Sequence, residues 1–158
     1  DAPIGENDID GGHTTLQSPV MDLTEYNEPI FSYWRWYINN PPSGANPNAD
    51  WWEVRISDDA GDSWTNIETT KTSDASWRRF AFKVSDYTES FEELQLQFIA
   101  SDSLRPGLNL DGGSLVEAAV DDIMLYDMVI ENSIDENETF NAFNLWPNPA
   151  RCRFKRTL

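Results

Sequence analysis

Short runs rich in β-branched and aromatic residues recur along the chain, and clusters of Pro, Gly, Asn and Asp separate them. Apolar and polar residues alternate within several runs, as in strands that bury one face. Helix signals are nearly absent. The pattern predicts an all-β chain with strands at 14–22, 29–39, 51–57, 64–69, 77–85, 93–100 and 115–127. Strands at this spacing favour a two-sheet antiparallel β-sandwich of jelly-roll type.

The same alternation divides the side chains of each strand between two faces. We expect three buried rows, which are Trp52, Val54 and Ile56, then Phe80, Phe82 and Val84, then Leu94, Leu96, Phe98 and Ala100. The run at 29–39 divides into its even-numbered residues and a second face with Phe31, Tyr33, Arg35 and Tyr37. We predict that this second face is an aromatic, polar and charged outer face.

The chain is strongly acidic, with 28 acidic and 11 basic residues and a net charge of −17 in 158 residues. This charge disfavours nucleic acids and anionic membrane surfaces as partners, because both are polyanions. It suits an extracellular, saline or calcium-rich setting, although an ordinary solvated acidic surface also explains it. No run approaches the roughly 20 apolar residues of a membrane-spanning helix, so we expect no membrane insertion. The length predicts one domain followed by a tail.

The chain contains one cysteine, Cys152, and one histidine, His13. A single cysteine excludes a disulfide within the chain, and together the two residues exclude the usual Cys/His zinc sites. A Ser-His-Asp or Cys-His mechanism would have to use His13 in a Gly-rich leader or Cys152 in a terminal tail. We therefore expect no catalytic residue in this chain.

Residues 56–65, ISDDAGDSWT, fit the pattern S-x-D-x-G-x-x-W through Ser57, Asp59, Gly61 and Trp64. The pattern resembles the Asp-box, which in sialidases is a structural turn away from the catalytic centre. Asp and Gly tolerate the positive φ values of a tight hairpin, and an Asp side chain can accept backbone N–H bonds within the turn. The motif therefore predicts a structural hairpin that Trp64 covers.

Paired aspartates lie within the predicted last strand, in SLVEAAVDDIMLYD. Carboxylates in a strand are unfavourable unless a partner neutralises or coordinates them, and Ca²⁺ prefers six to eight oxygen ligands. We predict a calcium site with Asp121 and Asp122, to which Asp8 and Asp10 would contribute if the first and last strands are neighbours. The alternative is a strand bend, with one carboxylate solvated and the other bonded to Arg or to the backbone.

Aromatic, charged and amide side chains are expected on one polar sheet face, namely Tyr33, Arg35, Tyr37, Glu53, Arg55, Arg79, Gln95, Gln97 and Glu117. A sugar-binding sheet would use such groups, because rings stack on the apolar faces of sugars and bidentate groups bond hydroxyls. Cross-strand salt bridges, such as Arg35 with Glu53, explain the same residues without a ligand. The carboxylates of Glu53 and Glu117 would be the pair in a glycoside hydrolase alternative.

Five phrases together resemble the jelly-roll accessory domains downstream of catalytic domains in large secreted bacterial proteins, often peptidases such as zinc carboxypeptidases. The phrases are TLQSPVMDLTEYNEPIFSYWRWY, WWEVRISDDAGDSWTNIE, SWRRFAFKVSDY, LQLQFIASD and VEAAVDDIMLYD. They are also similar to adhesin-type and MAM-like sandwiches. The resemblance covers residues 13–127 and implies an upstream catalytic domain in the parent protein.

A second resemblance begins at FNLWPNPA, which is similar to the opening of the C-terminal sorting domain of type IX secretion. That family continues for several more strands, whereas this chain ends after RCRFKRTL, which holds four of the eleven basic residues and no acidic residue. We therefore expect a β-sandwich accessory domain at 1–128 and a linker with a truncated sorting segment at 129–158. The resemblance implies a secreted or cell-surface parent.

These observations predict a non-catalytic binding, adhesion or spacer module of a secreted multidomain hydrolase, with calcium as a stabilising ion. The expected partner is a glycan or another cell-surface ligand, held by Tyr33, Arg35, Tyr37, Glu53, Arg55, Arg79 and Glu117. Two alternatives remain open at this point, a carbohydrate-active jelly-roll enzyme that uses a carboxylate pair and a purely structural spacer domain.

Overall fold

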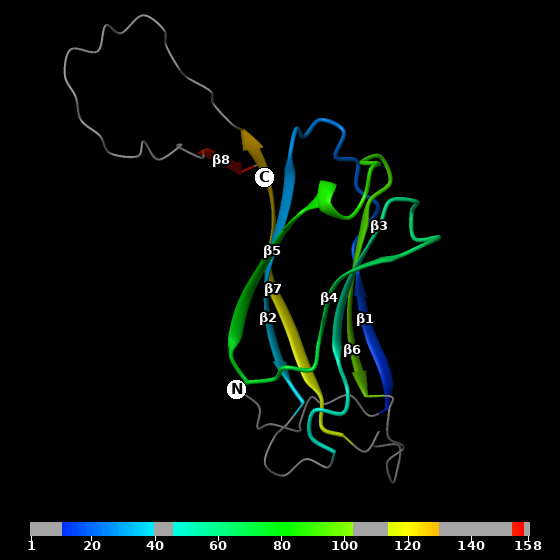
Figure 1. The fold of residues 1–158 in the computed structure, drawn as a ribbon, viewed down its shortest axis with the longest axis vertical. Coiled ribbons are helices and arrows are strands. Elements are labelled where there is room, and N and C mark those ends of the chain that lie inside the picture. The colour runs from blue at the N-terminus through cyan, green and yellow to red at the C-terminus, as the bar shows by residue number, and fades with distance from the viewer. Residues whose placement is uncertain (1–10, 40–45, 103–113, 130–152, 157–158) are drawn as a thin grey trace, which may run out of the picture.

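The computed structural model describes residues 11–39, 46–102, 114–129 and 153–156, which form strands and one short 3-10 helix, η1 (Val84–Asp86). The strands are β1 (Gly12–Gln17), β2 (Pro29–Ile38), β3 (Trp52–Ser57), β4 (Thr65–Thr70), β5 (Trp77–Lys83), β6 (Gln95–Asp102), β7 (Glu117–Val129) and β8 (Arg153–Arg156). They form a first sheet in the order β1-β6-β3-β4 and a second sheet in the order β5-β2-β7-β8. All pairings are antiparallel, and the two sheets lie as two layers (Figure 1). The predicted all-β, two-sheet antiparallel β-sandwich is confirmed.

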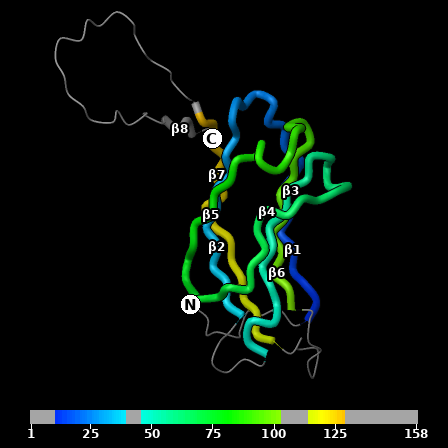
Figure 2. The backbone as a smooth tube through the Cα atoms, in the orientation of Figure 1, coloured from blue at the N-terminus to red at the C-terminus, as the bar shows by residue number. Residues whose placement is uncertain are grey.

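The chain passes repeatedly from one sheet to the other, as expected for a jelly-roll sandwich. Only the β3–β4 and β7–β8 connections join neighbours in the same sheet. Figure 2 shows the backbone running up and down between the two layers. As a result, side chains from strands distant in sequence meet in the core, for example the rings of Tyr33 and Phe98, whose centroids are 5.1 Å apart.

The core of the first sheet follows the predicted alternation. β3 contributes Trp52, Val54 and Ile56, and the β6 region contributes the even-numbered row from Leu94 to Ala100. In the second sheet Phe82 and Val84 are buried, and Phe80 packs against the same cluster from a partly buried position. The three predicted core rows are therefore confirmed, with Phe80 at the margin of the core.

The prediction that the odd-numbered residues of β2 lie on an outer face is wrong. Phe31, Tyr33 and Tyr37 belong to the buried core, and Arg35 is 7% exposed. The even-numbered residues instead face away from the first sheet, and Trp34 and Trp36 are partly exposed there. Since both faces of this strand are aromatic, its apolar alternation fits either orientation. The charge of Arg35 can lie inside because a carboxylate from β4 neutralises it.

Four residues of the basic tail, β8 (Arg153–Arg156), pair with the end of β7 between Tyr126 and Val129. This tail segment therefore adds an edge strand to the second sheet, beside a strand that belongs to the predicted accessory domain. The connecting residues 130–152 lie outside the described part of the chain, as do Asp8, Asp10 and Cys152. Among the described residues, no helix has the length and apolar character needed to cross a membrane.

Candidate ligand-binding site

The hairpin between β3 and β4 is closed by the side chains of its own motif. Ser57 Oγ accepts hydrogen bonds from the backbone N–H groups of Asp59 (3.2 Å) and Gly61 (2.8 Å). The Asp59 carboxylate in turn accepts from the Ser57 hydroxyl (2.6 Å) and from the backbone N–H of Ser63 (2.8 Å). These bonds to the Ser57 and Ser63 groups stabilise the charged carboxylate and lower the pKa of Asp59 to about 2.

Gly61 has a φ of +96°, and a Cβ at this position would lie 2.8 Å from Gln95 Oε1. The Trp64 ring would lie 3.4 Å from the same Cβ, so the tryptophan covers the glycine as predicted. Each residue of the motif therefore has a role in closing or covering the turn. The prediction of a structural hairpin is confirmed.

A hollow of about 200 Å³ lies on the outer face of the first sheet. Three neighbouring strands build it. Its lining residues are His13 from β1, Ile99 and Ser101 from β6, and Trp51, Glu53 and Arg55 in or next to β3. Its volume is below the roughly 300 Å³ at which enclosed ligand pockets begin, so it suits a ligand held at a surface.

The registers of the three strands place these side chains in rows. Ser101 is the cross-strand partner of His13, and its backbone N–H donates to the carbonyl of Trp51 (3.2 Å). One row further along the sheet, Ile99 is the partner of Glu53. Because Val54 and its even-numbered neighbours point into the core, the odd-numbered residues of β3 are left to form the outer face.

The charged groups of the hollow neutralise each other. Arg55 donates to Glu53, its neighbour two positions along the same strand face, and the Glu53 residue is only 8% exposed. Arg55 Nε is buried and has no hydrogen-bond partner among the described residues. A buried donor without an acceptor is costly to the fold, whereas the remainder of the Arg55 side chain, 34% exposed, reaches the hollow.

Trp51 supplies an aromatic wall to the hollow, and the Lys71 ammonium lies over its ring at 5.4 Å from the centroid. A half-buried indole next to an arginine and a carboxylate provides a stacking surface beside hydrogen-bonding groups. The arrangement can hold a small uncharged polar molecule that has one apolar face.

The structure does not bring the predicted ligand-binding residues together in one site. Glu53 and Arg55 line the hollow, whereas Arg79 lies on the outer face of the second sheet. Glu117 pairs with Ile38 in the second sheet and is buried. The remaining three, Tyr33, Arg35 and Tyr37, are in the interior. The prediction that all seven share one face is therefore wrong, because β3 lies in the first sheet whereas β2, β5 and β7 lie in the second, and because the odd-numbered residues of β2 face the core.

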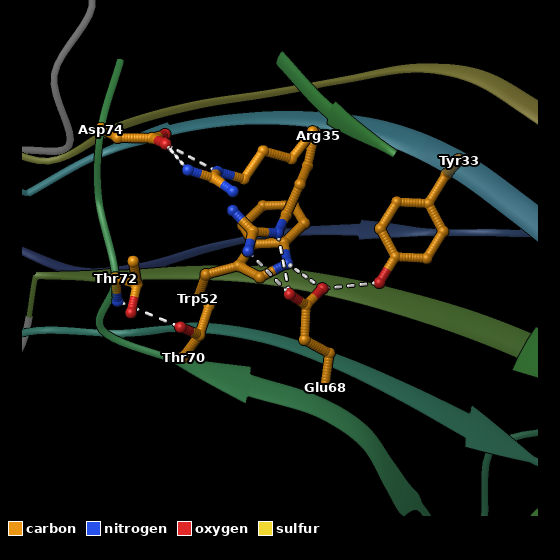
Figure 3. A network of polar contacts seen from close by, with 8 residues as sticks. Tyr33, Arg35, Trp52, Glu68, Thr70, Thr72 and Asp74 are labelled. Atoms are coloured by element: carbon orange, nitrogen blue, oxygen red, sulfur yellow. Dashed lines mark hydrogen bonds and ion pairs between the residues drawn. The ribbon is translucent and has the colours of Figure 1, made fainter. Parts of the chain in front are cut away.

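Figure 3 shows what the interior residues do instead. The Glu68 carboxylate, from β4, accepts hydrogen bonds from Tyr33 Oη (2.7 Å), Arg35 Nε (2.8 Å) and Trp52 Nε1 (3.2 Å). Arg35 Nη2 completes an ion pair with the same carboxylate at 2.8 Å. Burial and the Glu68 charge raise the pKa of Tyr33 well above its usual range. The network joins the two sheets, because donors on β2 and β3 share one carboxylate acceptor on β4.

The predicted pairing of Arg35 with Glu53 is also wrong, because Arg35 pairs with Glu68 and Glu53 pairs with Arg55. Glu53 and Glu117 lie in different sheets. Since Glu53 is held by an arginine, these two carboxylates do not have the arrangement that the glycoside hydrolase alternative requires.

Asp121 and Asp122 lie at a β-bulge, where β7 uses two residues opposite Tyr33 of β2. Asp122 has a φ of +48°, and its backbone N–H donates to Asp121 Oδ1 (2.7 Å). Both residues are exposed. This geometry matches the strand bend that was the alternative to a metal site.

The condition for a contribution from Asp8 and Asp10, that the first and last predicted strands are neighbours, is not met, because β1 pairs with β6 in the first sheet and β7 lies in the second. No group of three or more His, Cys, Asp or Glu side chains suited to a metal ion occurs within residues 11–39, 46–102 and 114–129. Asp8 and Asp10 lie outside the described residues, so the calcium site stays a prediction.

Sequence reasoning missed His13, Ile99 and Ser101 as members of the hollow. The alternation from Gln95 and Gln97 continues to Ile99 and Ser101 and could have extended the outer face by two rows. The contribution of His13 depends on the pairing of β1 with β6, which no local pattern specifies.

Comparison with known proteins adds no further assignment. No protein-family model matches the chain, and no curated protein is significantly similar to it.

Proposed function

We propose that this chain is a non-catalytic binding module of a secreted multidomain hydrolase and that it holds a glycan on the outer face of its first sheet. The observation that carries the proposal is the convergence of Trp51, Glu53 and Arg55 in one hollow. The resemblance to accessory domains of secreted peptidases supports the parental context and the cell-surface setting.

The chemistry of the hollow favours a neutral sugar. The ring of Trp51 offers an apolar surface for the C–H face of a pyranose, and the partly exposed guanidinium of Arg55 offers a donor for a hydroxyl. Glu53 compensates the arginine charge, so an anionic ligand gains little at this position. The net charge of −17 also disfavours polyanionic chains.

The test is binding of the intact chain to a panel of neutral oligosaccharides, measured by calorimetry. Trp51→Ala and Arg55→Met should each weaken binding about tenfold, since each removes a contact worth roughly 1–1.5 kcal/mol. Arg78→Met is the matched control, because Arg78 is exposed, lies in the second sheet and pairs with Asp74. A panel without binders, or variants that bind as the wild type does, would refute the proposal and favour a structural spacer.

Calcium stabilisation is a separate part of the proposal. Asp121 and Asp122 present two exposed carboxylates at the β7 bulge, and hard cations prefer such oxygens. Its test is the calcium dependence of thermal unfolding, given with the other predictions below.

A further inference from the structure

Three tryptophans gather on the outer face of the second sheet, opposite to the face with the hollow described above. Trp36 on β2 is the cross-strand partner of Trp77 on β5, and Trp34 follows two positions along β2 on the same face. Trp77 is 47% exposed, and Trp34 and Trp36 are partly exposed. None of the three belongs to the core cluster. Directly opposed side chains in a sheet have Cβ atoms about 5 Å apart, so the three indoles occupy neighbouring positions on one face.

A second hollow, of about 330 Å³, continues this surface along the same face. Its lining residues are Ile30, Arg79, Ala81 and Tyr126, from β2, β5 and β7. The hollow exists because the row between Trp34 and Ile30 carries the small side chains of Ser32 and Ala81. Its volume lies within the range of ligand sites, at their lower end.

One polar group that lines this hollow, the Arg79 guanidinium, has no partner among the described residues. Arg79 forms no hydrogen bond or ion pair with any residue of the described ranges, whereas its β5 neighbours Arg78 and Lys83 pair with carboxylates. A ligand that brings hydroxyl groups to this hollow would accept hydrogen bonds from Arg79.

We infer that the outer face of the second sheet is a second glycan-binding surface, on which pyranose rings stack on Trp34, Trp36 and Trp77 and receive hydrogen bonds from Arg79. This inference rests on the proposed function and extends it, because it makes the module bivalent. A neutral glycan is the occupant that fits, since flat aromatic groups match the C–H faces of sugars and the net charge of −17 repels polyanions.

The two faces point in opposite directions, because the sheets pack against each other through their inner faces. A bivalent module of this kind would bridge two glycan chains, or two segments of one chain. Two linked sites give a higher overall affinity for a polymer than either site alone. The first hollow alone would give a module that holds one chain.

The test is the stoichiometry of binding by the full chain, measured by calorimetry with cellohexaose, xylohexaose and mannohexaose. We expect two molecules per chain in the wild type and, at concentrations where a tenfold weaker site stays empty, one in Trp77→Ala or Trp51→Ala. Ala81→Leu is a second variant for the new surface, because Ala81 is exposed and a larger side chain fills the hollow without affecting the core. Arg78→Met should keep two sites, whereas Arg79→Met should weaken the second-sheet site about tenfold.

The outcomes separate this inference from the proposed function. One site per chain that is lost in Trp51→Ala and unchanged in Trp77→Ala and Ala81→Leu overturns the second surface and leaves the first. One site that is lost only in the second-sheet variants supports the second surface and overturns the first. Absence of binding by all three oligosaccharides overturns both, and tighter binding of oligogalacturonate at the second surface overturns the assignment of a neutral ligand.

Discussion

Replacement of Glu68 by glutamine tests the energetic importance of the inter-sheet network. The substitution keeps the size of the side chain and one acceptor oxygen for Tyr33 and Trp52, but it removes the charge opposite Arg35. The Arg35 and Glu68 side chains are each only 9% exposed, so the guanidinium would remain buried without a counter-charge. Breaking a buried ion pair in this way costs about 3–5 kcal/mol. For a domain of this size, the expected fall in melting temperature is roughly 6–20 °C.

The assay is denaturant unfolding followed by tryptophan fluorescence, with Glu28→Gln as the matched control. Glu28 pairs with Lys83 at 2.8 Å, but both side chains are about two-fifths exposed. Exposed pairs contribute about 0–1 kcal/mol, so this control should unfold almost as the wild type does. A difference of less than about 1 kcal/mol between Glu68→Gln and Glu28→Gln would refute the reasoning.

A double variant identifies the cause of the loss. In Arg35→Met with Glu68→Gln no uncompensated charge remains inside, and the glutamine oxygen still accepts from Tyr33 and Trp52. Replacement of a buried pair by neutral groups of similar volume is often nearly neutral. The double variant should therefore be more stable than Glu68→Gln alone. Additive losses would mean that shape, and not the unpaired charge, causes the destabilisation.

Three further predictions concern the hairpin and the β7 bulge. Gly61→Ala should destabilise the fold by about 1–3 kcal/mol in denaturant unfolding, whereas Ala60→Gly, at a φ of +55°, should be neutral or stabilising; equal losses would contradict the strain argument. The pKa of Asp59 is depressed to about 2, so the ionised carboxylate stabilises the fold at neutral pH, and this stabilisation is lost as the pH falls from 3.8 toward 2. Asp59→Asn should therefore have a lower melting temperature than the wild type at pH 6, and the two melting temperatures should converge below pH 2. Millimolar calcium should raise the melting temperature by several degrees relative to chelator, and Asp121→Asn with Asp122→Asn should abolish the difference; identical melting in both buffers would exclude the calcium site.

The strands and most of the core could be predicted because the alternation of apolar and polar residues and the turn residues indicate them locally. In β3 only the row of Trp52, Val54 and Ile56 is apolar enough to face the core, since Glu53 and Arg55 occupy the other face. Turn chemistry likewise placed the hairpin, since Asp59 accepts a backbone N–H bond within the turn and Gly61 has a positive φ. These features depend on neighbours in sequence, so they can be read without knowledge of the tertiary pairing.

The facing of β2 and the location of the site could not be predicted in the same way. β2 has aromatic residues on both faces, and its orientation depends on a buried arginine whose partner, Glu68, lies 33 residues further along the chain. Glu68 occurs in TNIETT, a short polar strand with no alternation that would indicate an interior carboxylate. The hollow combines β1, β6 and β3, and their order in the sheet follows from long-range pairing.

The Glu68 network also bears on how the module would respond to mechanical load. In the proposed setting, next to a catalytic domain at a cell surface, the sandwich would be pulled along its length, and apolar contacts alone would not oppose sliding of one sheet over the other. Here Tyr33 and Arg35 of the second sheet both bond to the Glu68 carboxylate of the first sheet. Sliding of one sheet over the other must therefore break three polar contacts together. The Glu68 carboxylate would therefore resist shear between the two sheets, and it lies on β4, an edge strand of its sheet.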